Sequence, residues 1–151
     1  MSSDMPYENS GGYSDTAAEG AGLRHDERLE NRDLNDRLLH RATYLKPEDR
    51  VLLNNIYQHG MTQRELATLM GICTQTVGRR ANRLCKRLNS ELFSFVLVNR
   101  GKWSRKRRRV AELYFLQGYA LRETVARSGE SMHQVRKHVQ AVIESYESLK
   151  P

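Results

Sequence analysis

Cysteine is scarce in this sequence: Cys73 and Cys85 are the only two among 151 residues. On one helix, the 12 positions between them would span about 18 Å, whereas a disulfide needs Cα atoms about 4.4–6.8 Å apart. The chain also lacks a Cys-x-x-Cys pair and a Cys/His cluster. We therefore expect no disulfide between these residues, no structural zinc site and no cofactor.

Long apolar runs are missing as well. The longest, Phe95–Val98, makes a single helical turn, whereas a membrane-spanning helix needs about 20 apolar residues. The first residues lack the basic start and apolar centre of a signal peptide. These absences predict no membrane contact and a cytoplasmic protein.

Catalytic motifs are the third absence. None of the five histidines belongs to a recognisable catalytic motif, and no Gly-rich phosphate loop or metal-ligand spacing occurs. The sequence therefore predicts that the protein is not an enzyme and has no catalytic residues.

Positive charge is what the chain has, and it is unevenly distributed. Lys and Arg number 25 against 18 Asp and Glu, which gives a formal net charge of +7. Residues 1–22 contain four acidic residues and no Lys or Arg, and their composition predicts a disordered acidic arm. A basic body with an acidic arm favours a polyanionic partner, most often nucleic acid. A basic domain without such a partner is the alternative.

Two helices are expected before the central motif. Residues 23–44 alternate charges of both signs around a thin line of leucines, which is typical of an exposed helix. This helix could be a packing arm, a homodimer contact or a solvated linker. The next helix should begin at Pro47 and end at Gly60, and its apolar face consists of Leu52, Leu53, Ile56 and Tyr57.

Residues 62–80, TQRELATLMGICTQTVGRR, predict two short helices joined by a glycine turn. Thr62 and Glu65 have the spacing of a capping box, and Gly71 permits the positive φ of a tight turn. Thr74 can cap the helix that follows. We expect the first helix to direct inward Leu66, Ala67, Leu69 and Met70.

The second of these helices carries a continuous apolar stripe. Its members, at steps of three or four, are Val77, Ala81, Leu84, Leu88, Leu92 and Phe95. The stripe predicts one helix that continues to about residue 98. With the stripe inward, the side chains on the outer faces are Gln75, Thr76, Arg79, Arg80 and Arg83. These are residue types that a helix in the major groove uses to contact DNA; a solvated basic face is the alternative.

A shift of the sequence by 58 positions aligns it with itself without gaps. The aligned identities include Gly60 with Gly118, Arg64 with Arg122, Glu65 with Glu123, Gly71 with Gly129, and Val77 with Val135. This echo predicts a second helix–turn–helix unit with helices near 104–117, 121–128 and 132–149. The copy is imperfect, because Ala120 and Thr124 replace the capping Thr62 and the apolar Leu66. We expect a less stable second unit.

In the last helix Ser131 can act as the cap. The expected inward residues are Val135, Val139, Val142, Tyr146 and Leu149. Those expected to face outward or flank the core are His133, Gln134, Arg136, Lys137 and His138. We predict that the first four of these contact DNA.

The segment between the units is strongly basic. Residues 100–109 contain seven Lys or Arg and no acid, and positive charge in the first turn of a helix opposes the macrodipole. Beside predicted DNA-binding helices, this cost favours phosphate contact by Arg105, Lys106, Arg107, Arg108 and Arg109; a solvated helix start is the alternative. Trp103 is expected to anchor a core or interface, with base stacking as the alternative.

Residues 45–88, LKPEDRVLLNNIYQHGMTQRELATLMGICTQTVGRRANRLCKRL, resemble region 4 of the sigma-70 family of bacterial RNA polymerase sigma factors. The resemblance implies a helix–turn–helix that binds the upstream promoter element of double-stranded DNA. It also implies helices that touch the β flap of the RNA polymerase core. The second unit resembles the same fold more weakly, and its last helix is similar to that of LuxR-type response regulators.

The resemblance has limits. Nothing in the chain resembles sigma region 2, and Cys73 stands where the family usually has a small hydroxyl residue. We therefore expect an all-α, nucleoid-associated regulator of transcription with tandem helix–turn–helix units at 45–98 and 99–151. The alternatives are a polymerase-associated partial sigma or interaction module, and an accessory protein of DNA recombination or packaging.

Overall fold

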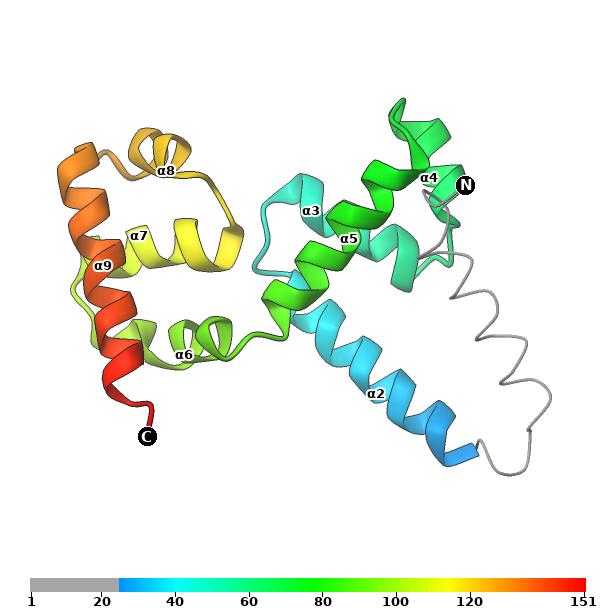
Figure 1. The fold of residues 1–151 in the computed structure, drawn as a ribbon, viewed down its shortest axis with the longest axis horizontal. Coiled ribbons are helices and arrows are strands. Elements are labelled where there is room, and N and C mark those ends of the chain that lie inside the picture. Colours follow the sequence, from blue (N-terminus) through cyan, green and yellow to red (C-terminus); the bar gives the residue numbers. More distant parts are fainter. Residues whose placement is uncertain (1–24) are drawn as a thin grey trace. The chain divides into compact units, whose positions relative to one another are not determined.

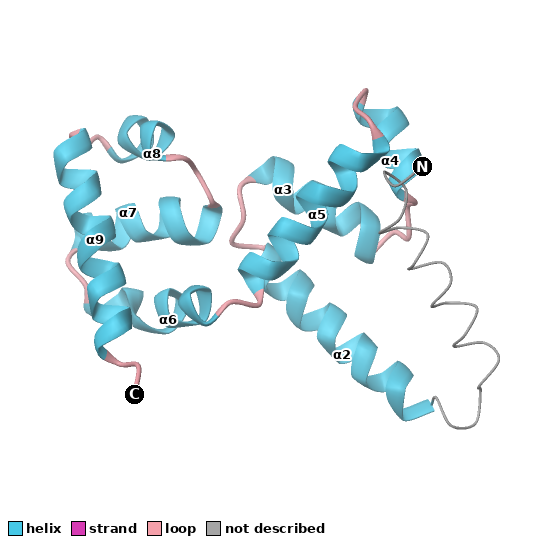
Figure 2. Ribbon diagram, in the orientation of Figure 1, coloured by secondary structure: helices cyan, strands magenta, loops and turns pink. Residues whose placement is uncertain are grey.

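The computed structural model describes residues 25–151, and all regular structure in this range is helical (Figure 2), which confirms the predicted all-α class. The predicted acidic arm, residues 1–22, lies outside the described residues. The chain forms two compact units, which Figure 1 shows as ribbons. The described part of unit 1 comprises residues 25–43 and Pro47–Lys86, and unit 2 comprises Tyr44–Lys46 and Arg87–Pro151.

Unit 1 contains helices α2 (His25–Ala42), α3 (Pro47–Tyr57), α4 (Gln63–Met70) and most of α5 (Thr74–Leu88). The buried apolar side chains of this unit are Leu38, Ala42, Leu52, Leu53, Leu66, Ala67, Val77, Ala81 and Leu84. Helix α2 is the charged helix predicted for residues 23–44. Leu38 and Ala42 near its C-terminal end are buried, whereas Leu34 is exposed.

The predicted capping box at the start of α4 is confirmed. The backbone N–H of Glu65 donates to Thr62 Oγ1, and the N–H of Thr62 donates to Glu65 Oε1, both at 3.0 Å. Hydrogen bonding of the Glu65 carboxylate to the Thr62 backbone N–H, followed by its interaction with the Thr62 hydroxyl, holds the pKa of Glu65 below its usual range. The contribution of this carboxylate to stability is thus complete at neutral pH and is lost as the pH falls through the lowered pKa. Gly71 ends α4 in the left-handed region, with φ of 69°.

The inward face of α4 differs from the prediction at two positions. Leu66 and Ala67 are buried, but Leu69 is 71% exposed and Met70 is 38% exposed. Gln63 is buried with them and lies three and four residues before Leu66 and Ala67, so the inward face comprises the first part of α4 and not its last turn before Gly71.

The cap of α5 is Cys73, so the predicted cap by Thr74 is wrong. The carbonyl of Cys73 accepts the N–H groups of Thr76 and Val77 at 3.0 and 3.3 Å, which is the geometry of an N-cap residue. Its Sγ lies 3.0 Å from Thr76 Oγ1. Hydrogen bonds from Thr76 lower the pKa of the Cys73 thiol.

The predicted continuous helix to residue 98 is also wrong, since α5 ends at Leu88 and α6 (Glu91–Asn99) begins a separate helix. Ser90 caps α6 by accepting the N–H of Phe93 at 3.1 Å. The apolar period continues across this break, but α6 packs against η3 and α9 in unit 2. Phe93 and Val96 are buried, while Leu92 and Phe95 of the predicted stripe are half-buried.

Unit 2 continues with a 3₁₀ turn η2 (Arg100–Lys102), α7 (Arg105–Ala111), the π-helical segment η3 (Glu112–Gln117), α8 (Leu121–Ser128) and α9 (Met132–Ser148). Helix α9 crosses α6, α7 and α8 and contacts all three (Figure 1). The buried apolar side chains of unit 2 are Leu45, Leu88, Phe93, Val96, Val110, Ala111, Leu113, Phe115, Leu116, Tyr119, Val135, Val139 and Val142.

The elements of the two units repeat with the 58-residue spacing of the sequence echo. Both ends of α4 correspond to both ends of α8, and the start of α5 corresponds to the start of α9. Cys73 corresponds to Ser131, which caps α9 by accepting the N–H of Gln134 at 3.2 Å. Gly129 ends α8 with φ of 76°, as Gly71 ends α4.

The second unit accommodates one of its two altered positions, Thr124, but has no replacement for the lost cap at Ala120. Ala120 provides no side-chain cap to α8, as expected. The Thr124 side chain is fully buried, and its hydroxyl donates to the carbonyl of Ala120 at 2.9 Å. A buried hydroxyl with a partner avoids most of the cost of desolvation, so Thr124 fits the position that Leu66 fills in unit 1.

The C-terminal end of α9 differs from the expected stripe. Tyr146 is half-buried, packs against Phe95 with ring centroids 5.5 Å apart and ring planes tilted by 60°, and donates a hydrogen bond to Glu91 at 3.2 Å. Leu149 is 69% exposed, so its predicted inward position is wrong. The helix ends at Ser148, one residue before it.

Candidate nucleic-acid interface

The outer side of α5 presents a line of polar side chains. Gln75, Arg79 and Arg83 are exposed and follow one another at steps of four. Residues at this spacing share a helix face. Val77, Ala81 and Leu84 are buried on the opposite side of α5. The exposed line is therefore held in place by a packed helix.

The other two residues predicted to face DNA from α5 are engaged within unit 1. Thr76 is half-buried beside Cys73. Arg80 Nη2 donates to Asp49 Oδ1 at 3.3 Å, and the exposed fractions of these side chains are 26% and 8%. Arg80 thus neutralises a buried carboxylate in the first turn of α3.

We expect Arg80→Ala to lower the stability of unit 1 by about 1–3 kcal/mol, because it leaves the buried carboxylate of Asp49 without its partner. Thermal unfolding followed by circular dichroism measures this. Arg79→Ala removes the same charge from an exposed position and should leave the midpoint nearly unchanged. Adding Asp49→Asn to Arg80→Ala should recover part of the loss; equal midpoints for the two arginine variants would contradict the structural role.

Helix α9 presents a comparable face in unit 2. Val135, Val139 and Val142 are buried. The four residues predicted to contact DNA from this helix are all exposed: His133, Gln134, Arg136 and Lys137. In the 58-residue register, His133 and Lys137 correspond to Gln75 and Arg79 of α5. Both long helices therefore carry polar side chains at the same two positions.

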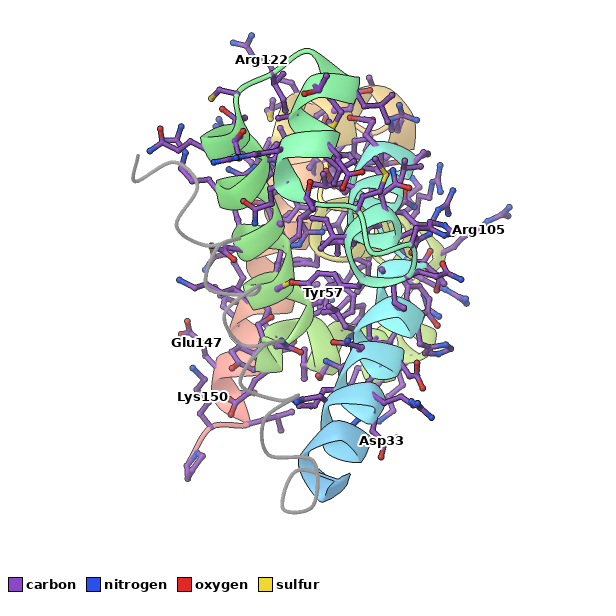
Figure 3. The ribbon with its side chains drawn as sticks, turned by 90° about the vertical axis from the view of Figure 1, so that its right-hand side faces the viewer. Asp33, Tyr57, Arg105, Arg122, Glu147 and Lys150 are labelled. Atoms are coloured by element: carbon purple, nitrogen blue, oxygen red, sulfur yellow. The ribbon has the colours of Figure 1, made fainter. Side chains whose placement is uncertain are left out.

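The basic segment divides into engaged and exposed side chains. Glu112 Oε2 accepts from Arg100 at 3.1 Å and lies 3.5 Å from Arg108 Nε. Arg105, Lys106 and Arg109 are exposed and form no ion pair with the described part of the chain. Figure 3 shows the labelled side chain of Arg105 extending away from the ribbon. Three of the five cations predicted to bind phosphate are thus directly available.

Arg107 is held by a histidine that was not among the predicted site residues. Its Nε donates to His138 Nδ1 at 3.4 Å. Burial, followed by the charge of Arg107, lowers the pKa of His138, and Lys137 and Lys106 add to the effect against the opposing charge of Glu130. A neutral imidazole can accept this bond. These cations from α7 and α9 therefore lie close together.

The pair of Arg107 and His138 corresponds in the 58-residue register to the pair of Asp49 and Arg80. The first pair joins α7 to α9 in unit 2, and the second joins α3 to α5 in unit 1. The sequence echo aligns these two pairs with each other. The sequence does not show that they are bonded, because the members of each pair are 31 positions apart.

Trp103 packs against the interior of unit 2, as predicted for an anchor residue, rather than standing exposed for base stacking. It is half-buried, and its ring lies 6.0 Å from that of Phe95, centroid to centroid. No group of three or more His, Cys, Asp or Glu that could hold a metal ion occurs within residues 25–151. Over the same range, no helix is both long and apolar enough to cross a membrane.

No family model matches the chain, and searches of curated proteins and of solved structures find no match. The resemblance of residues 45–88 to sigma region 4 therefore stays a prediction based on the residues themselves.

Proposed function

We propose that this protein is a sequence-specific, double-stranded DNA-binding regulator of transcription in which α5 contacts bases in the major groove. The observation that carries the proposal is the exposed line of Gln75, Arg79 and Arg83 on a helix whose opposite side is buried. A short capped helix and a left-handed glycine turn precede this helix. Helices placed in this way serve as groove-binding helices in helix–turn–helix proteins.

The chemistry of the line suits base recognition. An arginine guanidinium can donate two hydrogen bonds to guanine O6 and N7, and a glutamine amide can pair with adenine N6 and N7. Long side chains aligned on one helix face can reach successive base pairs. Positively charged side chains elsewhere on the surface mainly attract the phosphate backbone of the DNA. The corresponding residues His133 and Lys137 on α9 give unit 2 the same potential.

Selection from random duplexes followed by filter binding tests the proposal. We expect enrichment of a defined sequence. If six to eight phosphates are contacted, the logarithm of the binding constant should fall with the logarithm of salt concentration with a slope of about −5 to −7. No enrichment and a slope near zero would reject DNA binding.

A second candidate function is a polymerase-associated interaction module. The observation that favours it is the exposure of two adjacent large apolar side chains at the end of α4, Leu69 at 71% and Met70 at 38%, since contiguous exposed apolar surface suits a protein contact. A pull-down of RNA polymerase core without DNA separates the candidates. Under this hypothesis Leu69→Asp abolishes capture and Arg79→Ala leaves it intact.

A further inference from the structure

Unit 2 contains a groove of about 590 Å³ next to the turn that precedes α9. Its lining residues come from α7, the start of η3, the end of α8 and the turn before α9: Arg105, Lys106, Arg108, Arg109, Glu112, Ser128 and Glu130. The groove thus collects most of the basic segment against the turn that leads into α9.

The charge of the groove is positive despite its two carboxylates. Glu112 is compensated by Arg108 and by Arg100, which lies outside the lining. Glu130 is then opposed by three exposed cations, Arg105, Lys106 and Arg109. Like charges held this close repel one another unless an anion lies between them. The groove therefore favours an anionic ligand.

The lining also indicates which anion is bound. It contains no aromatic or large apolar side chain on which a nucleobase could stack, whereas pockets for small organic ligands are mostly apolar. A phosphate group needs only cationic and hydrogen-bonding partners, and the exposed cations of the lining supply both, whereas the Ser128 hydroxyl is engaged with the Val125 carbonyl and the Glu130 N–H. The chemistry fits a phosphodiester better than a free nucleotide.

We propose that this groove holds a backbone phosphate of the DNA bound by unit 2, with Arg105, Lys106 and Arg109 as its ligands. This inference rests on the proposed function. A duplex lying against the exposed face of α9 brings its backbone to the turn that precedes the helix, where Glu130 lines the groove. Such a contact sets the register of the helix on the duplex without selecting bases.

The test compares two double variants of the full chain that lose equal charge. Arg105→Ala with Lys106→Ala removes two groove cations. Arg122→Ala with Lys150→Ala removes two exposed cations of unit 2 that do not line the groove, and Figure 3 labels both. Thermal unfolding of each variant checks that the fold is retained.

We expect the groove variant to reduce the steepness of the salt dependence by about 1.8, which is two contacts at about 0.9 each, on selected and random duplexes alike. The control variant should keep the wild-type slope. If wild type binds DNA and the two variants have equal slopes, the groove holds no backbone phosphate, although DNA binding stands. If wild type shows no salt-dependent binding, the proposed function itself fails.

A competition arm distinguishes a free anion from the duplex. Inorganic phosphate or ATP is titrated into the free protein while the backbone amide resonance of Arg109 is followed. We expect only weak shifts, because a single free phosphate lacks the other contacts that the duplex makes. Tight binding of either ligand, lost in the groove variant while the DNA slope stays unchanged, would identify a free-anion site and overturn the proposal.

Discussion

Replacing Arg79 by alanine is expected to weaken binding to the selected DNA site by about 1–3 kcal/mol, roughly 5- to 150-fold, with a much smaller effect on random duplex. Arg79 is exposed at the centre of the line on α5. A guanidinium that pairs with a base edge contributes to one sequence, whereas one that pairs with phosphate contributes to all sequences. Competition binding with the selected site and a scrambled duplex measures the difference.

Two further variants sharpen this test. Arg79→Lys keeps the charge but removes the planar pair of donors, so it should lose most of the specificity while retaining binding to random duplex. Arg122→Ala removes an exposed charge from α8 and should leave specificity intact. If Arg79→Ala weakens selected and random duplexes by the same factor, α5 contacts backbone and the assignment of base recognition is wrong.

Replacing Phe93 by alanine is expected to destabilise unit 2 by about 3–5 kcal/mol, because a large buried ring is lost and a cavity remains. Phe93 is only 2% exposed and belongs to α6, the helix that the sequence joined to the first unit. Urea unfolding followed by the fluorescence of Trp103, the single tryptophan of the chain, reports on unit 2 directly.

The matched control for this experiment lies on the same helix. Val98 is 74% exposed, so Val98→Ala should change the free energy of unfolding by about 0.5 kcal/mol or less. A Trp103 transition that is equally sensitive to both substitutions, or to neither, would show that α6 is not part of the core of unit 2.

The arginines of this chain are not interchangeable, and the structure separates their roles. Arg80 and Arg107 each bond to a residue of another helix in their own unit. Arg79 and Arg105 are exposed. Substituting Arg80 or Arg107 is expected to lower stability directly. Loss of DNA binding in such variants is therefore interpreted only together with their unfolding midpoints.

The sequence by itself determined the local structure. The capping box of Thr62 and Glu65, the turn at Gly71, and the start of α3 at Pro47 all lie where the residues predicted them. Each depends on hydrogen bonds or backbone preferences within four residues, so the information is complete in a short segment. The alternation of Val77, Ala81 and Leu84 with Gln75, Arg79 and Arg83 likewise defined both faces of α5, because a helical period needs no knowledge of the partner.

Only the tertiary structure decided what those faces meet. The apolar period runs from α5 into α6 without interruption, so it did not show that Leu88 ends one helix and Phe93 packs in another unit; Ser90 followed by Glu91 was the one local indication of a new start. The bonds of Arg80 with Asp49 and of Arg107 with His138 depend on how separate helices pack together. Periodicity specifies the direction of a side chain but not its partner, and the partner determines which arginines remain available for DNA.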